Sequence, residues 1–340
     1  MMRAERLARR LFRSLLLLPV MLCAACHDVS AESRPGDAVH VATDASPRLE
    51  VVGYLPSYRL NAVRGEQLRG VDRILYFGLE PAADGTLPEP VVADDVLLRL
   101  RQLQAESGAA LVLCVGGWEK SAEFMAACRT TESRRRFLRP MAALCEDGLF
   151  SGVDFDWEYP KTPEERAAYT RLLRDASAML APCGGSVSVA VAPWQDLGSD
   201  AFAAVDCVHL MSYDHAHPQA TYAKSIADLE TLAGHGVAAG ETLLGLPFYG
   251  RDASREARSA ADLLSAEPAL TGDLSTGGFS LNNAETLRQK VRLAADRGLA
   301  GVMIWELGQD IDGERSLLWA VLRERDRLAA VPPRRTQDGG

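Results

Sequence analysis

Three acidic residues stand two apart in the middle of the chain, within the segment GVDFDWEYP at 152–160. Asp154, Asp156 and Glu158 alternate there with large apolar residues. Side chains two apart on a β-strand share a face, so a strand here carries three carboxyl groups on one face. An edge strand with one solvated face would show the same pattern. Buried, adjacent carboxyl groups repel one another and hold protons more tightly, which suits general acid–base catalysis.

Helical patterns precede and follow this segment, which indicates a parallel strand covered on both sides. The predicted strands are 49–54, 73–78, 110–116, 152–156, 186–192, 206–213, 243–248 and 300–305. The predicted helices are 94–106, 132–146, 163–180, 223–233, 284–297 and 314–329, with weaker patterns after the first and fifth strands. Eight strand–helix units predict an α/β protein with a (β/α)8 TIM barrel as a single catalytic domain at 49–330. An open doubly wound sheet is the alternative.

Active sites of such barrels lie at the C-terminal ends of the strands. Aromatic and charged residues follow several of the predicted strands in this sequence. Outside the acid row they include Trp118, Tyr213, Asp214, Arg251 and Trp305, and Met211 precedes Tyr213 at the end of its strand. Each aromatic residue taken alone is also consistent with core packing. Together, rings that stack on sugars and carboxylates that bind hydroxyl groups predict a carbohydrate site.

Several motifs support a specific resemblance. The segment SGVDFDWEYP at 151–160 resembles the strand-four signature D-G-x-D-x-D-x-E of glycoside hydrolase family 18, the chitinase family. Five further segments agree, namely VVGY at 51–54, LVLCVGGW at 111–118, MSYD at 211–214, LGLPFYGR at 244–251 and GVMIWEL at 301–307. The resemblance extends over about residues 49–328, in barrel order.

The resemblance implies a retaining glycosidase in which the substrate's own 2-acetamido group is the nucleophile. It implies that Glu158 is the general acid, that Asp156 binds the acetamido N–H, and that Asp154 shares a proton with Asp156. Tyr213 would donate a hydrogen bond to the acetamido oxygen. The implied sugar-binding residues are Tyr54, Trp118, Met211, Asp214, Arg251 and Trp305. No metal and no cofactor are expected.

The implied substrate is a polysaccharide or oligosaccharide that contains N-acetylglucosamine (GlcNAc), with β-1,4 linkages as in chitin. One alternative is an endo-β-N-acetylglucosaminidase that acts on N-glycans or peptidoglycan. An inactive chitin-binding lectin is a further alternative, but such lectins typically lack the acid, and Glu158 is present.

The sequence departs from the family pattern in three places. Ser151 stands where the signature begins with Asp, and Cys114-Val115 displaces a Ser that usually precedes Gly-Gly, which puts one hydrogen bond in doubt. The connection after strand seven is short for the α+β insertion that many members carry, so we expect a shallow, open groove. We also expect a monomer.

Composition narrows the possible partners. The net charge of −9 and the pI of about 5.3 argue against nucleic-acid binding. The spacing of the cysteines fits no metal site. Cys145 and Cys183 fall near the C-terminal ends of two predicted helices, so a disulfide between them is one expectation, and buried free thiols are the other.

The N-terminal segment predicts export. Residues 1–25 combine five arginines with an apolar run at 15–22, the layout of a secretory signal. The ending Cys23-Ala-Ala-Cys26 resembles a lipobox, so we expect lipidation of Cys26, with cleavage near Ala25 as the alternative. A flexible linker at 26–48 and a disordered tail at 331–340 would flank the barrel. The protein would be an outer-membrane or cell-surface lipoprotein, or periplasmic or secreted, in contact with a membrane only through that lipid.

Overall fold

The computed structural model describes residues 48–330, except 271 and 276. The predicted signal segment, the C-terminal tail and all of the linker but residue 48 lie outside the described residues. Among the described residues, no helix combines the length and the apolar composition that crossing a membrane would require.

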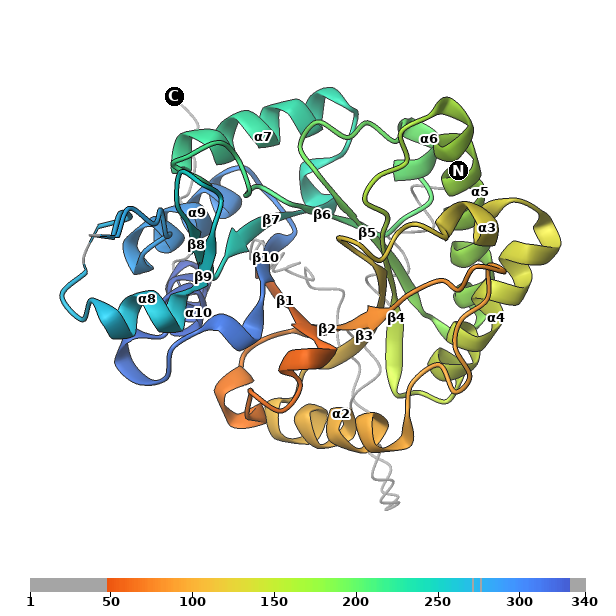
Figure 1. Ribbon diagram of the computed structural model, residues 1–340, viewed down its shortest axis with the longest axis horizontal. Coiled ribbons are helices and arrows are strands. Elements are labelled where there is room, and N and C mark those ends of the chain that lie inside the picture. The colour runs from red at the N-terminus through yellow and green to blue at the C-terminus, as the bar shows by residue number, and fades with distance from the viewer. Residues whose placement is uncertain (1–47, 271, 276, 331–340) are drawn as a thin grey trace, which may run out of the picture. The chain divides into compact units, whose positions relative to one another are not determined.

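Within the described part of the chain, eight parallel strands close into a barrel in the order β1-β10-β7-β6-β5-β4-β3-β2 (Figure 1). The strands are β1 (Glu50–Pro56), β2 (Arg73–Leu79), β3 (Ala110–Gly116), β4 (Phe150–Asp156), β5 (Ser186–Val191), β6 (Cys207–Leu210), β7 (Thr242–Pro247) and β10 (Gly301–Trp305). All eight overlap the predicted strands, so the prediction of a TIM barrel is confirmed.

Helices surround the barrel in Figure 1. Their bounds are α2 (Asp94–Ser107), α3 (Phe124–Cys128), α4 (Thr131–Glu146), α5 (Pro163–Leu180), α6 (Ser199–Phe202), α7 (Tyr222–Gly234), α8 (Ala260–Ala266), α9 (Ala284–Asp296) and α10 (Leu317–Ala329). The start of α5 follows from its sequence, because the Thr162 side chain accepts a hydrogen bond from the backbone N–H of Glu165. The helix α10 begins three residues later than predicted, because Ser316 caps it.

The two connections with weak helical patterns contain little α-helix. Between β1 and β2 the chain forms the 3-10 turns η1 (Ser57–Arg59) and η2 (Gly65–Leu68), and α6 after β5 has 4 residues. The segment between β7 and α9 contains a hairpin of β8 (Tyr249–Arg251) and β9 (Ala257–Ser259), followed by α8. In Figure 1 this hairpin lies to the left of the barrel, next to α8.

The strands separate two apolar layers. One fills the barrel interior and contains Val52, Leu75, Val112, Leu243 and Met303. The larger layer lies between the strands and the surrounding helices. Register decides which interior side chains meet, and it pairs Asp154 of β4 with Cys114 on β3 and Ser188 on β5.

The cysteines of the described barrel are free thiols, so the bridge expected between Cys145 and Cys183 is not formed. Cys145 is buried and Cys183 is exposed. Burial raises the pKa of the Cys145 thiol to about 12, which keeps it protonated and unreactive at neutral pH. The expectation of buried free thiols holds for Cys145 but not for the exposed Cys183.

Candidate active site

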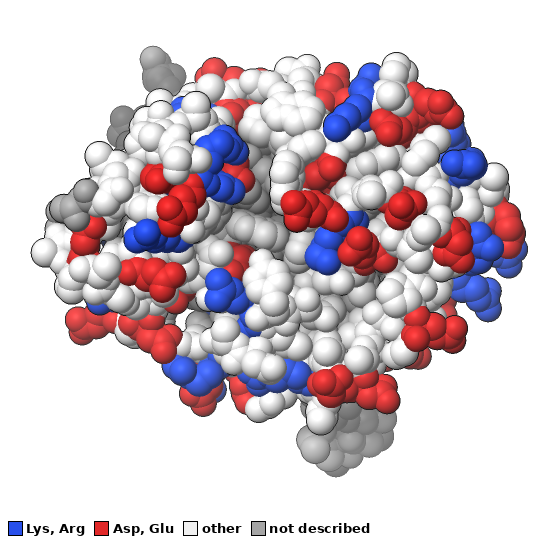
Figure 2. All heavy atoms as spheres, viewed as in Figure 1, with Lys and Arg blue, Asp and Glu red and all other residues white. Residues whose placement is uncertain are grey.

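The strand β4 positions the acid row. Asp154 and Asp156 face the barrel interior, where both are buried, while Val153 and Phe155 belong to the outer apolar layer. Glu158 lies just beyond the C-terminal end of the strand and is partly exposed. The alternation predicted from the sequence therefore places three carboxyl groups at increasing height in the barrel. A space-filling view from the same side as Figure 1 shows a hollow at the centre of this face with both acidic and basic side chains around it (Figure 2).

Asp154 is enclosed by partners. Tyr54 Oη donates to Oδ2 at 2.8 Å and Ser188 Oγ to Oδ1 at 2.6 Å, while Cys114 Sγ lies 3.3 Å from Oδ2. His209 Nδ1 lies 3.2 Å from Oδ1. Burial alone would raise the pKa of Asp154, but the His209 imidazole and these donors hold it below its usual range. Cys114 therefore supplies a hydrogen bond at the position where the departure from the family pattern had put one in doubt.

Asp156 differs from Asp154 both in its hydrogen bonding and in the direction of its pKa shift. Within the described residues, its Oδ1 is buried and has no hydrogen-bond partner. Burial, followed by the negative charges of Glu158 and Asp154, raises the pKa of Asp156 well above its usual range. The row thus combines an ionised inner carboxyl with a middle carboxyl that has one unoccupied oxygen.

Glu158 is held by its backbone and its neighbours. Its N–H donates to Ser121 Oγ at 3.0 Å, and that hydroxyl lies 3.1 Å from the carbonyl oxygen of Asp156. Burial, and then the charge of Asp214, raise the pKa of Glu158, although the Tyr159 hydroxyl and the backbone of Trp118 nearby act in the opposite direction. A raised pKa is what a general acid near neutral pH requires.

The ends of β6 and β7 face the acid row. The Tyr213 hydroxyl lies 3.9 Å from the sulfur of Met303. Asp214 accepts a hydrogen bond from the Tyr249 hydroxyl at 2.7 Å and forms an ion pair with Arg251. Met211, which precedes them, packs against the barrel interior. The structure therefore brings together four residues predicted from the sequence, namely Met211, Tyr213, Asp214 and Arg251.

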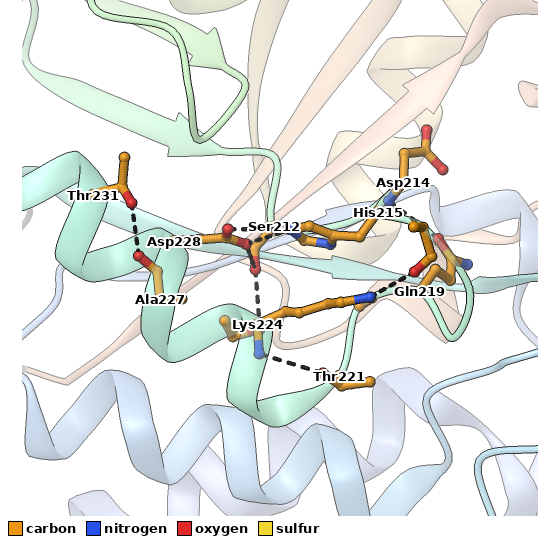
Figure 3. Close-up of polar contacts among 12 residues, drawn as sticks. Ser212, Asp214, His215, Gln219, Thr221, Lys224, Ala227, Asp228 and Thr231 are labelled. Carbon is orange, nitrogen blue, oxygen red and sulfur yellow. Dashed lines mark hydrogen bonds and ion pairs between the residues drawn. The ribbon is translucent and has the colours of Figure 1, made fainter.

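A buried carboxylate on α7 holds the segment that carries Tyr213 and Asp214 (Figure 3). Asp228 accepts a hydrogen bond from Ser212 Oγ at 2.6 Å, and its Oδ1 lies 3.1 Å from His215 Nε2. Ser212 and His215 flank the two predicted site residues in the chain. Asp228 therefore fixes both ends of this four-residue segment.

The rest of the loop is also anchored. The N–H of Asp214, a residue with a φ of 60°, donates to Gln219 Oε1 at 3.2 Å. Further on, the carbonyl oxygen of Ala220 accepts hydrogen bonds from Lys290 Nζ at 2.6 Å and from Asn282 at 2.9 Å. Burial lowers the pKa of Lys290 to about 7. These contacts compensate for a left-handed backbone at a residue other than glycine, which is energetically unfavourable.

The substitution Asp228→Asn tests this anchor. An amide keeps one acceptor oxygen but carries no negative charge, so its hydrogen bonds to Ser212 and His215 are weaker, and we expect the free energy of unfolding to fall by ~1–3 kcal/mol. We expect kcat to fall about tenfold with a smaller change in KM, because Tyr213 and Asp214 lose their fixed position. Thr231→Ala on the same helix is the control, because the Thr231 side chain is exposed and its hydroxyl donates to the carbonyl oxygen of Ala227 in α7. Equal kinetics for Asp228→Asn and Thr231→Ala would refute the role of the anchor.

Two predicted aromatic residues differ in exposure. Trp305 ends β10, and its ring centroid lies 5.4 Å from that of Tyr54 and 5.1 Å from that of Phe77. Trp118 has 68% of its surface exposed. Tyr54 is buried, so its direct contribution is the hydrogen bond to Asp154 beneath the site. Of these three aromatic residues, Trp118 is therefore exposed, Trp305 is partly buried and Tyr54 is fully buried.

Sequence reasoning missed several residues of the site. Trp194 follows β5, is 63% exposed, and packs against Tyr159 at 4.7 Å between ring centroids. Its position just after a predicted strand was the signal that could have identified it. Ser121 and Asp228 lie outside the strands and belong to no motif. His209 lies within a strand whose neighbouring residues are apolar.

Comparisons with known proteins identify relatives. The family model described as "Glycosyl hydrolases family 18" matches residues 76–310. Endochitinase 1 of Metarhizium robertsii is 23% identical in an alignment 271 residues long that covers 61% of this chain and 63% of that protein. Chitinase A1 of Niallia circulans is 25% identical in an alignment 312 residues long that covers 67% of this chain and 44% of the relative. The chain thus spans less than two thirds of either relative.

Solved structures agree on the fold. A family 18 chitinase from the chitin utilization locus of Flavobacterium johnsoniae superposes with a TM-score of 0.74 at 20% identity, over 83% of this chain and 95% of that one. A chitinase from Cycas revoluta, solved in complex with (GlcNAc)4, superposes with a TM-score of 0.69 at 17% identity, over 82% of this chain and 99% of that one. Both contain the same barrel.

Proposed function

The chain belongs to family 18 of the glycosyl hydrolases, and on that premise we propose that it hydrolyses β-1,4 linkages between GlcNAc residues in chitin or chitooligosaccharides. The observation that carries the proposal is the pair formed by Glu158 and Asp156 at the barrel mouth, with the buried Asp156 Oδ1 lacking a partner among the described residues. Such an oxygen suits an N–H donor, and the 2-acetamido group of GlcNAc carries one. The relatives named chitinases support this choice of substrate.

The proposed mechanism needs no nucleophile from the protein. Glu158 donates its proton to the glycosidic oxygen, while the acetamido carbonyl oxygen attacks the anomeric carbon and the bond to the leaving sugar breaks. Asp156 accepts a hydrogen bond from the acetamido N–H and stabilises the positive oxazolinium ion. Tyr213 donates to the acetamido oxygen. The Glu158 carboxylate then takes a proton from water, which opens the oxazolinium ring with retained configuration.

The sugar chain would lie across the aromatic residues of the mouth. In this arrangement Trp305 forms the floor beneath the reacting sugar, with Met211 and the Asp214–Arg251 pair beside it. Trp118 and Trp194 are exposed in the loops after β3 and β5, the strands on either side of β4. We propose that both stack on sugars of the leaving-group side, because they flank Glu158.

Removal of one of these rings should weaken the binding of long oligomers. For Trp194→Ala we expect KM for a GlcNAc hexamer to rise about tenfold, because the lost ring surface accounts for a few kcal/mol at most. KM for a trimer should change much less, because a short oligomer does not reach this ring. Trp319→Ala, at a 42% exposed tryptophan on α10, is the matched control. An equal effect on trimer and hexamer would contradict the assignment.

The proposed function is tested by mass spectrometry of the products from three substrates: GlcNAc oligomers, a high-mannose glycopeptide and peptidoglycan. We expect shorter oligomers from the first substrate only. Cleavage restricted to the glycopeptide or to peptidoglycan would mean that the substrate is that GlcNAc-containing glycan and not chitin. Binding of oligomers without products would point to a lectin. We also propose that the groove is open, so that cleavage is endo and products from crystalline chitin are not dominated by the dimer.

Export remains part of the proposal. We propose that the chain is carried across the membrane and that Cys26 is lipidated, on the basis of the sequence at 1–26. Mass spectrometry of the protein purified from its native membrane fraction checks this directly. A mature chain that begins near residue 26 without a lipid would support export but refute the lipid anchor.

A further inference from the structure

A histidine lies beneath the acid row, inside the barrel. His209 on β6 is 1% exposed, and its Nδ1 lies 3.2 Å from Asp154 Oδ1 and 2.9 Å from the Tyr54 hydroxyl. Its Nε2 lies 3.6 Å from Cys207 Sγ. None of the catalytic steps proposed above uses this imidazole.

The groups that face His209 come from the surrounding strands. Asp154 on β4 is the carboxylate in direct contact, and Asp156 lies further up the same strand. Tyr54 on β1 and Cys114 on β3 are neutral partners of Asp154, since burial raises the pKa of both well above their usual values. Arg73 on β2 interacts with Cys207, but its guanidinium is paired with Glu50. The positive charge that faces Asp154 within the described barrel can therefore come only from His209.

We propose that His209 is a positioning residue which stays protonated at working pH and neutralises Asp154, so that the exchangeable proton of the acid row resides on Asp156 and Glu158. This inference rests on the proposed function, because it assigns the charges of the same site. It changes one expectation from the resemblance: the inner carboxyl does not take part in sharing the proton.

Physical chemistry supports this distribution of charge. Burial alone would favour neutral imidazole, but Asp154 and, after it, Cys207 together outweigh burial and raise the pKa of His209 to about 10. An ionised Asp154 without a cation would be an unpaired charge in a closed interior, which is strongly unfavourable. The four donors around Asp154 favour its ionised form, whereas Asp156 has none at Oδ1 within the described residues. The exchangeable proton is therefore shared by Asp156 and Glu158, and Asp156 is ionised when Glu158 carries it.

The protonation state of His209 can be measured in the intact protein by NMR of its two ring nitrogens between pH 5 and 9. We expect both to be protonated throughout this range. In Asp154→Asn, the same signals should titrate at lower pH, because the negative charge that most strongly opposes the effect of burial is then gone. A neutral ring at pH 7 in the parent protein would overturn the proposal.

The second measurement is the pH profile of kcat/KM. His209→Gln removes a positive charge beneath the row, so the acidic limb should move to higher pH by about 1 unit, the low end of what a neighbouring charge does. Ser188→Ala removes a neutral donor to Asp154 and should move the limb by less than half as much. An unmoved limb in His209→Gln would show that the imidazole does not act on the catalytic carboxyl groups.

The two hypotheses fail in different ways. If the parent protein cleaves no GlcNAc glycan, the proposed function fails, while the NMR result still decides whether His209 is charged. If it cleaves such glycans and His209 is neutral at pH 7, the proposed function stands and only the charge assignment is wrong.

Discussion

Replacing Glu158 by Gln is expected to lower kcat on chitooligosaccharides by ~10²–10⁴-fold, the usual contribution of general acid–base catalysis. The amide has nearly the same volume as the carboxyl group but carries no proton for the glycosidic oxygen. The aromatic residues and Asp156 are untouched, so oligomer binding measured by calorimetry should change little. The measurements are steady-state hydrolysis and direct binding of the same oligomer.

The pH dependence provides a second criterion for Glu158. Burial and Asp214 raise its pKa, so the acid keeps its proton to a higher pH than a free glutamic acid with a pKa of about 4.3. On the alkaline side, activity should therefore fall as the pH rises through the raised pKa, and any residual activity of Glu158→Gln should lack this alkaline limb. Glu164→Gln, at an exposed position on α5, is the control. Near-normal turnover of Glu158→Gln would exclude it as the acid.

The barrel could be predicted because its signals are local. Apolar runs bounded by turn residues identify strands, and the Thr-Pro-Glu-Glu start of α5 fixes that boundary to the residue. The strand β6 was predicted at 206–213 but ends at Leu210, because the next residues leave the ladder. The N–H of Ser212 bonds to Leu210 and that of Tyr213 to Met211. Local turns of this kind cannot be recognised from the pattern of apolar residues in the sequence.

The chemistry at strand ends was also predictable, but the supporting contacts were not. Asp154 and His209 are 55 positions apart in the sequence and meet only because strands β4 and β6 face a common interior. A histidine in an apolar strand is usually a core residue whose hydrogen bonds are satisfied, so its presence there does not by itself predict a contact with the active site. Asp228 is similar, since a helical aspartate usually faces solvent. Only the closed barrel shows that each contacts the catalytic segments.

The substitution Asp156→Asn should separate catalysis from stability. We expect kcat to fall by ~10²–10³-fold, as when one preorganised electrostatic contact to a developing charge is removed. A neutral amide offers the oxazolinium ion no negative charge. KM should change less than kcat, because the contact strengthens in the transition state. Asp147→Asn, at an exposed residue after α4, is the control.

The same substitution should stabilise the fold at neutral pH. Burial and two neighbouring carboxylates raise the pKa of Asp156, so the folded chain holds this proton to a higher pH than the unfolded chain. Its contribution to stability is therefore lost as the pH rises from about 4 toward the folded pKa. Asp156→Asn removes this loss, so unfolding at pH 7 should require about 0.5–2 kcal/mol more than in the parent, with no gain at pH 3. A variant less stable than the parent at pH 7 would mean that Asp156 is not strained by its neighbours, and the charge distribution along the row would have to be reassigned.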